Sequence, residues 1–540
     1  MKTKNIVLGL AATALLASCS GTTKKADGGE SGGSSEGKSV LLVATYDGGL
    51  GTSWLQSLGN RFAEAYKDVS FEEGKKGVTV RVLASRSYNG TTLLSGALEQ
   101  DVYFTEDVSY FDHVNKGNFL DISSTVGEKL TEFGETKSIE DKLSSEMKDY
   151  LKAKDGKYYA IPFYDGLYGL TYDYDLFEDK NLFFNASGNF VSAKTDKKSS
   201  GPNGKEGDYD DGLPATYDQF YKLVSRIEAL GMHPFAFSGS NGLPYVYRVL
   251  TSYWSDFEGL DNAKVNYTLN GTVPLVSSIK DGVATTEQTK IDETNGYLLQ
   301  KQEGKLKALQ FMKTITPHMG RNGDNQSAAQ TNFIKNYNTG SDEYAMLFDG
   351  SWWENETTNI FKNCEAAYGR GKADRRYGFL PIPKASEEKI GQKQTLFNQN
   401  QSYCFISART KLPELSKLFL EYAHTDVSLS AFTAELSLTR SLAYELTEED
   451  KSKATFYAKN LIDMKNDSNI LNPVSSNTKV INNSSTFNLE SYAWTTEING
   501  KVYSNPYTVF SDSATSGTTA EQYFEGLSTY NGKARWDTLN

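Results

Sequence analysis

The sequence predicts an α/β protein with more than one hydrophobic core. Its 540 residues exceed the roughly 100–200 residues of one ordinary domain, so we expect two or three cores. Residues 39–46 and 77–84 are short apolar runs typical of buried strands, and residues 52–66 between them repeat apolar side chains on one helical face. Strand, helix and strand in this order indicate a βαβ unit in a largely parallel sheet.

A second α/β unit begins near residue 213. Thr216 and Gln219 form a capping-box pattern, and Gly231 is suited to end the amphipathic helix that follows them. The strand-like segment 232–237 comes directly afterwards, so helix and strand again alternate. Other expected elements are strands at 101–104, 342–350, 377–385 and 401–408 and an amphipathic helix at 412–426.

The first 38 residues predict export from the cell. Lys2 and Lys4 precede an apolar run from Ile6 to Leu16, which is about half of the roughly 20 residues that span a bilayer. We therefore expect residues 1–18 to be a signal peptide. The sequence LASC resembles the lipobox of bacterial lipoproteins, which implies acylation of Cys19; a non-lipidated signal is the alternative. Residues 20–38 are rich in Gly and Ser and predict a flexible tether.

Composition and charge exclude several classes of partner and site. The formal net charge is -12, so we expect no nucleic-acid partner. The four His are isolated, without HExxH or CxxC spacing, and we expect no transition-metal site and no cofactor. Cys364 and Cys404 are far apart in sequence; a disulfide is one option, but we favour two buried, small apolar side chains.

Two polar insertions interrupt the α/β pattern, at 183–212 and about 257–300. The first contains DYDDG, which faintly resembles a calcium loop. Placing Gly212 at the sixth position of such a loop puts Gly207 at the first, where a carboxylate is needed, so we expect no metal ion there. The second contains Asn270-Gly271, which suggests a hairpin turn.

Seven segments occur in an order that resembles a known family. They are DVYF, GNFLDIS, KYYAIPFYDGLYGLTYDYDLF, LPATYDQFYKLVSRIEALGMHPFAF, AMLFDGSWW, YGFLPIPKA and the strand and helix that end at HTD. From Ser39 to Asp426 this order is similar to that of the extracellular solute-binding lipoproteins (family 1) of carbohydrate ABC transporters, which include maltose-binding protein. This chain departs from the family in its two insertions and in a longer tail after residue 430.

The resemblance implies a two-lobed, type II periplasmic-binding-protein-like fold. Each lobe would be a mostly parallel sheet flanked by helices, and a hinge would join the lobes. The implied division is a signal peptide at 1–18, the lipidated Cys and tether at 19–38, an N-terminal lobe at 39–163 plus about 375–428, and a C-terminal lobe at about 167–374 plus about 429–540. The segment Tyr159 to Phe177 would be the first crossing between the lobes.

A sugar presents apolar C–H faces, which suit flat aromatic rings, and a rim of hydroxyls, which suit carboxylates, amides or Arg. Ligands of doubly wound sheets lie at the carboxyl ends of strands. The residues that follow predicted strands in this way are Tyr46, Asp47, Glu106, Asp107, Tyr164 and Asp165. For each acid in this set, the alternative is a solvated loop position without a ligand.

The resemblance adds aromatic candidates further along the chain. It implies a stacking role for Tyr245, with core packing as the alternative, and another for Trp352. Trp353 is a candidate as well, but neighbouring helical residues face different ways, so we expect only one of the two tryptophans at the ligand. Trp254 and Arg440 are further candidates, and Arg440 would otherwise form a surface contact or an ion pair.

The function that follows is capture of a carbohydrate by hinge closure and its delivery to a membrane permease. We expect a monomer without catalytic activity, anchored to the bacterial cell membrane and facing outward. A binding protein for a peptide or polyamine is the alternative, followed by a secreted glycoside hydrolase and a surface adhesin. A hydrolase needs two carboxyl groups about 5–9 Å apart, and the chain lacks the eight repeated βα units of a barrel.

Overall fold

The computed structural model describes residues 35–539, apart from 97, 240–242, 321–324, 340–341, 400–401 and 484–490. The predicted signal peptide, Cys19 and most of the tether lie outside the described residues. Within the described part of the chain, no helix combines the length and the apolar composition needed to cross a membrane.

The first sheet is built mainly from the N-terminal part of the chain. Its order is β2-β1-β3-β12-β4. The strands are β1 (Ser39–Tyr46), β2 (Val78–Ser85), β3 (Val102–Thr105), β12 (Tyr403–Ile406) and β4 (Ile161–Pro162). β1 pairs in parallel with β2 and β3, and α1 (Ser53–Ala65) connects β1 to β2, which confirms the predicted βαβ unit.

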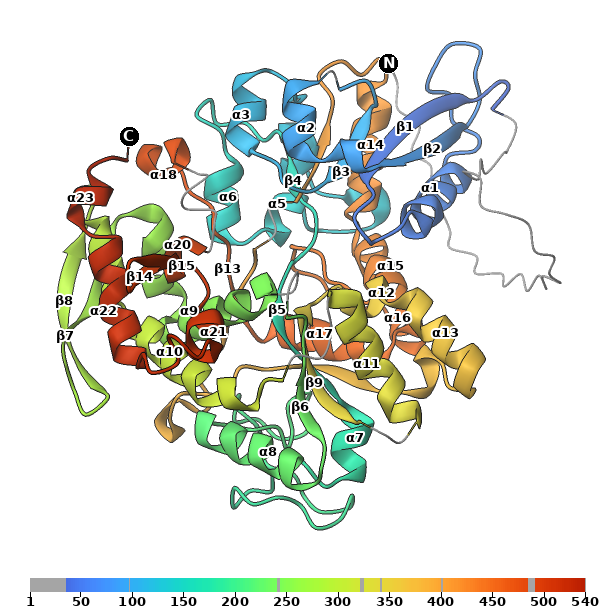
Figure 1. The fold of residues 1–540 in the computed structure, drawn as a ribbon. Coiled ribbons are helices and arrows are strands. Elements are labelled where there is room, and N and C mark those ends of the chain that lie inside the picture. Colours follow the sequence, from blue (N-terminus) through green and yellow to red (C-terminus); the bar gives the residue numbers. More distant parts are fainter. Residues whose placement is uncertain are drawn as a thin grey trace.

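Helices cover this first sheet and bury one hydrophobic cluster with it (Figure 1). The helices that contribute to this cluster include α1, α2 (Gly90–Ser95), α3 (Tyr110–Asn115), α4 (Ser123–Gly127), α5 (Ile139–Lys142), α6 (Ser145–Leu151), α14 (Pro413–Ala423) and α15 (Asp426–Leu436). The short α16 (Glu448–Lys453) packs against α15. Cys404 is free and buried in this cluster, as the sequence predicts.

The second sheet has the order β10-β5-β9-β6. Its strands are β10 (Tyr377–Leu380), β5 (Tyr168–Asp173), β9 (Tyr344–Gly350) and β6 (His233–Ala236). The predicted helix before β6 is α8 (Tyr217–Ala229): the Thr216 hydroxyl accepts from the Gln219 backbone N–H, and Gly231 has the positive φ of a helix-ending residue. The Gln219 side chain accepts from Ala215 instead of closing the capping box.

A larger set of helices surrounds the second sheet and shares a second hydrophobic cluster, which includes the free Cys364. They include α8, α7 (Tyr174–Asp179), α9 (Leu243–Thr268), α10 (Glu303–Ile315), α11 (Gln326–Thr339), α12 (Trp353–Glu356), α13 (Thr358–Tyr368), α20 (Ser491–Trp494), α21 (Pro506–Ser511) and α22 (Ala520–Tyr530). Two small sheets complete this second lobe. In one, β11 (Thr395–Phe397) pairs with β13 (Asn469–Leu471), and in the other, β14 (Thr496–Ile498) pairs with β15 (Lys501–Tyr503).

The hairpin of the second insertion lies at a different place from the one predicted. β7 (Gly271–Lys280) and β8 (Val283–Ile291) turn at Asp281-Gly282, where both residues have positive φ. Asn270-Gly271 joins α9 to β7 instead. The hairpin packs with α18 (Thr478–Asn482) and α23 (Lys533–Trp536) in a third, smaller cluster at one edge of the molecule (Figure 1).

The two-lobed α/β fold with mostly parallel sheets is confirmed, and each sheet contains one reversed strand. β12 runs antiparallel to β3 and β4, and β5 runs antiparallel to β9 and β10. A parallel pair needs a long crossover within one lobe. Strands that arrive directly from the other lobe, such as β12 and β5, enter their sheets without that crossover and run in the opposite direction.

The chain also passes from one lobe to the other at points other than the expected residues 375 and 429. β10 belongs to the second sheet, whereas Leu429 and Leu442 pack in the first cluster. The helix α17 (Phe456–Asn466) contributes to both clusters and lies between the lobes. The boundaries depend on pairing between distant segments, so the resemblance placed them too early in the chain.

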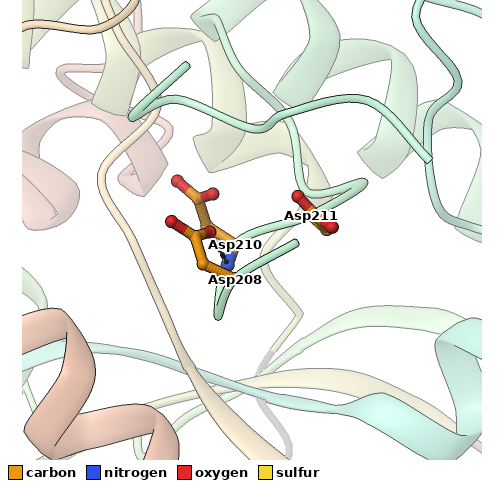
Figure 2. Close-up of side chains that lie close together, drawn as sticks. All are labelled: Asp208, Asp210 and Asp211. Carbon is orange, nitrogen blue, oxygen red and sulfur yellow. Dashed lines mark hydrogen bonds between the residues drawn. The ribbon is translucent and has the colours of Figure 1, made fainter. Parts of the chain in front are cut away.

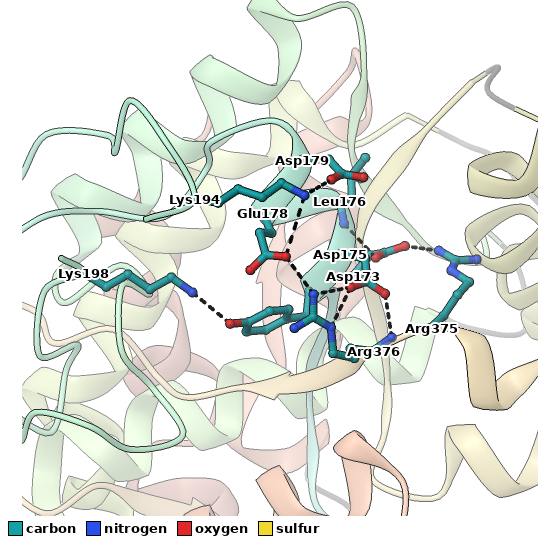
Figure 3. A network of polar contacts seen from close by, with 10 residues as sticks. Asp173, Asp175, Leu176, Glu178, Asp179, Lys194, Lys198, Arg375 and Arg376 are labelled. Carbon is teal, nitrogen blue, oxygen red and sulfur yellow. Dashed lines mark hydrogen bonds and ion pairs between the residues drawn. The ribbon is translucent and has the colours of Figure 1, made fainter. Parts of the chain in front are cut away.

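Ion pairs fasten the start of β10 to the second lobe (Figure 3). Arg375 and Asp173 form a fully buried salt bridge. The Arg376 side chain donates to Asp175 at 2.6 Å and to Glu178 at 2.8 Å. These contacts are made to the end of β5 and to α7, which is why residues 375–380 stay with the second sheet.

Candidate ligand-binding cleft

A cavity of about 450 Å³ opens where the two lobes meet. Its walls come from both sheets, from the crossing segment and from α9. The lining residues are Gly48, Gly49, Leu50, Thr91, Glu106, Asp107, Ser109, Tyr164, Gly166, Tyr168, Tyr245, Arg248, Trp352, Glu356 and Gln399. Residues after the carboxyl ends of β1 and β3 form the first-lobe side, as expected for ligand sites of α/β sheets.

Glu106 is the central acid on the first-lobe side. It follows β3, and its Oε1 accepts a hydrogen bond of 2.8 Å from the Tyr164 hydroxyl. Burial is the main reason that the pKa of Glu106 is raised to about 7. The hydrogen bond from Tyr164 lowers this pKa, and the charge of the nearby Asp107 raises it. At neutral pH this carboxyl group therefore exists in both forms and can accept from or donate to a ligand hydroxyl.

Asp107 is held in an unusual backbone conformation beside Glu106. Its φ is 57°, in the left-handed region, and its carboxylate accepts from the Asn89 side-chain amide. The adjoining α2 approaches closely, because a Cβ added to Gly90 would lie 2.7 Å from the Asp107 carbonyl oxygen. The glycine thus lets the end of β3 reach α2 and keeps both acids at the cleft.

Three aromatic rings form a corner on the second-lobe side. Tyr168 stands edge-on to Trp352, with ring centroids 4.9 Å apart at 88°, and to Tyr245, at 5.3 Å and 74°. Arg248 donates to the Tyr168 hydroxyl at 2.5 Å, and its guanidinium carbon lies 4.9 Å from the centroid of the Tyr168 ring. Edge-on packing fixes the rings in place, and each comes from a different element of the lobe.

A second group of acids lies on the same side of the cleft. Glu356 accepts from Gln330 at 3.1 Å, and Gln330 also donates to the buried Asp349 at 2.9 Å. Burial, together with the charge of Glu356, raises the pKa of Asp349 to about 7, and burial raises the pKa of Glu356 as well. The cleft therefore combines an aromatic corner with carboxylates from both lobes, beside Arg248.

Five of the residues predicted from the sequence line this cleft: Glu106, Asp107, Tyr164, Tyr245 and Trp352. Tyr46 and Asp47 do not. The cleft is lined instead by the next three residues, 48–50. The Tyr46 ring packs over Gly48, where an added Cβ would lie 2.3 Å from a ring carbon, and Asp47 is exposed.

Asp165 and Arg440 are structural residues of the crossing. Asp165 is buried, and its carboxylate accepts from the Thr439 hydroxyl at 2.9 Å. Arg440 is equally buried and donates to the Phe163 carbonyl and to Nε2 of His424. Burial and the charge of Arg440 hold the pKa of His424 well below its usual range, so the neutral ring accepts this bond. Neither of these two predicted residues lines the cleft.

The remaining tryptophans lie in the core. Trp254 donates through Nε1 to Gln302 at 3.2 Å, and Trp353 packs edge-on against Tyr377 at 5.0 Å. Of the neighbouring pair Trp352 and Trp353, one lines the cleft and the other is fully buried, as the helical geometry predicted.

Sequence reasoning missed several lining residues. Arg248 and Glu356 could have been found, because they follow Tyr245 and Trp352 by three and four positions, the spacing of helical neighbours. Tyr168 lies within the crossing segment itself. Thr91 and Gln399 carried no such local signal.

The comparisons with known proteins agree with this architecture. No family model and no curated protein matches the chain by sequence. Solved structures do match. RafE in complex with raffinose has 15% identity and a TM-score of 0.50, over 91% of this chain and 100% of that chain.

Two further structures match to a similar extent. A probable secreted solute-binding lipoprotein from Streptomyces coelicolor has 13% identity and a TM-score of 0.51, over 91% of this chain and 98% of that chain. A chitin oligosaccharide binding protein has 13% identity and a TM-score of 0.51, over 92% of this chain and 98% of that chain. The chain therefore has the two-lobed, type II fold of solute-binding proteins.

Proposed function

We propose that this protein is the extracellular carbohydrate-binding subunit of an ABC import system. The observation that carries the proposal is the cleft between the lobes, where the aromatic corner of Tyr168, Tyr245 and Trp352 shares one cavity with Glu106 and Asp107. Rings suit the C–H faces of a sugar, and acids and Arg248 suit its hydroxyls.

The mechanism we propose is capture by closure. A sugar that stacks on the second-lobe corner and donates hydroxyls to the first-lobe acids touches both lobes at once only when they are close together. It therefore stabilises the closed form by its differential contacts. The closed, loaded protein would then dock on membrane permease subunits, held nearby by acylated Cys19 and the tether of residues 20–38.

Two neighbours of the same fold support a saccharide ligand, since one is in complex with raffinose and another is a chitin oligosaccharide binding protein. The lipoprotein from Streptomyces coelicolor supports the proposed anchoring. We propose that the protein acts as a monomer.

A thermal-shift screen of the mature protein against monosaccharides, oligosaccharides, peptides and polyamines tests the proposal. A bound ligand raises stability by RT ln(1 + [L]/Kd), so we expect at least one saccharide to raise the melting temperature. A shift with peptides or polyamines alone would contradict the carbohydrate assignment. If chromatography of the same mixtures detects a shorter sugar released from an oligosaccharide, that result would indicate a hydrolase instead.

A further inference from the structure

Three aspartates of the first insertion gather their carboxylates at one point away from the cleft. Asp208, Asp210 and Asp211 each offer one oxygen, and these oxygens lie within 4.8 Å of one another. Figure 2 shows the carboxylates of Asp208 and Asp210 side by side, with Asp211 on the same loop. None of the three lines the cleft.

The cluster is incomplete in its hydrogen bonding. Asp210 is fully buried, and its Oδ1 atom receives no hydrogen bond from the described residues. Oδ1 of Asp211 is buried and unpartnered in the same way. The other oxygens accept from backbone groups, Asp210 Oδ2 from Asn203 N–H and Asp211 Oδ2 from Gly207 N–H, both at 2.9 Å. A buried carboxylate oxygen without a partner is costly.

The lysines of this insertion make their hydrogen bonds and ion pairs with groups other than these three carboxylates, although Lys198 acts electrostatically on Asp211 and Lys205 on Asp208 and Asp210. Lys205 pairs with Asp467, Lys197 with Glu206 at 2.9 Å, and Lys198 donates to the Tyr174 hydroxyl at 2.8 Å. Asp210 is fully buried, and the carboxylates of Asp208 and Asp211 lie close to it. The three acids thus repel one another at close range, and a cation or a proton must offset that repulsion.

We propose that Asp208, Asp210 and Asp211 bind one Ca²⁺ ion that fastens the insertion to the second lobe. Ca²⁺ binds oxygen ligands at 2.3–2.6 Å, so ligands on opposite sides of the ion lie up to about 5 Å apart, and the spacing of these carboxylates fits. Asp208 is exposed, which leaves room for water to complete the six to eight ligands. The ligand spacing differs from the twelve-residue loop that the sequence excluded.

The site is placed to act as a clamp. Asn203, beside the cluster, donates to Asp208 at 2.7 Å and to Asp467 at 3.2 Å, and Asp467 follows α17 directly. Neutralising the acids would therefore stabilise the contact between the insertion and the helix that lies between the lobes.

The experiment is titration of the mature protein, stripped of divalent ions by EDTA, with CaCl₂ up to about 5 mM, above the roughly 0.1–1 mM dissociation constants of extracellular calcium modules. Calorimetry measures stoichiometry, and thermal melting measures stability. We expect one Ca²⁺ per chain and a melting temperature that rises by a few degrees. The matched control is Glu206→Gln, an exposed acid of the same insertion, which should behave as wild type.

Two variants distinguish a cluster that binds an ion from a cluster of acids that has only a structural role. Asp210→Asn and Asp211→Asn keep the size of the side chain but remove a charged ligand, so both should lose the heat of calcium binding and the calcium-dependent rise in melting temperature. Without calcium, Asp210→Asn should melt no lower than wild type, because its neutral amide replaces a carboxyl group that must otherwise hold a proton. No heat of binding and no calcium-dependent change in melting of the wild type would overturn the proposal and leave a proton on Asp210 as the neutralising species.

Discussion

Replacing Glu106 with Gln should stabilise the ligand-free protein at alkaline pH. The pKa of Glu106 rises from 4.5 to about 7, chiefly through burial. At 1.36 kcal/mol per pKa unit this corresponds to about 3 kcal/mol, which we reduce to about 2–3 kcal/mol because the side chain is partly exposed.

The direction follows from proton linkage. Below pH 4.5 Glu106 is protonated in both the native and the unfolded chain, and its burial carries no charge penalty. Between pH 4.5 and 7 the native state keeps a proton that the unfolded state loses, so the stability of the wild type falls as the pH rises. Above pH 7 the full penalty is present, and the Gln variant avoids it.

Urea unfolding of wild type and Glu106→Gln between pH 4 and 8.5 measures this difference. The two curves of unfolding free energy against pH should converge near pH 4 and separate by about 2–3 kcal/mol at pH 8. Glu435→Gln, an exposed acid of the same lobe that pairs with Arg61, controls for general charge effects. A constant difference across the pH range, or a less stable Glu106→Gln at pH 8, would refute the reasoning.

Three other substitutions test separate parts of the structure. Arg375→Met leaves Asp173 buried without its partner and should lower the urea-unfolding free energy by about 3–5 kcal/mol; a loss under 1 kcal/mol would contradict the buried pair. Trp352→Ala should weaken saccharide binding in calorimetry by about 2 kcal/mol, or roughly 30-fold, while the exposed Tyr368→Ala leaves it unchanged; equal effects would remove Trp352 from the site. Asp165→Ala should cost about 1–3 kcal/mol of stability because the buried hydroxyl that donates to it is left unpaired, and a denaturation midpoint equal to wild type would argue against that role.

Local signals explain what the sequence could predict. β1, α1 and β2 were placed within a residue of their observed ends, because apolar periodicity is a local property. Glu106 and Asp107 were found for a similar reason, since the end of a strand can be seen in the sequence and strand ends are where such sheets bind ligands.

Tertiary pairing explains what the sequence could not predict. Residues 375–380 join the second sheet through β5 and the Arg375 ion pair, contacts about 200 positions apart along the chain. Asp165 and Arg440 have the residue types of a sugar site, but the bonds that bury them come from distant segments. Burial of a polar side chain is decided by those partners, which a pattern of residue types does not reveal.

The most direct test of sugar capture between the lobes is small-angle X-ray scattering of the mature protein with and without a saturating saccharide identified by the thermal screen. Closure predicts a smaller radius of gyration for the loaded protein and no such change for Trp352→Ala at the same saccharide concentration. A saccharide that binds with one-to-one stoichiometry but leaves the wild-type scattering curve unchanged would contradict capture by closure.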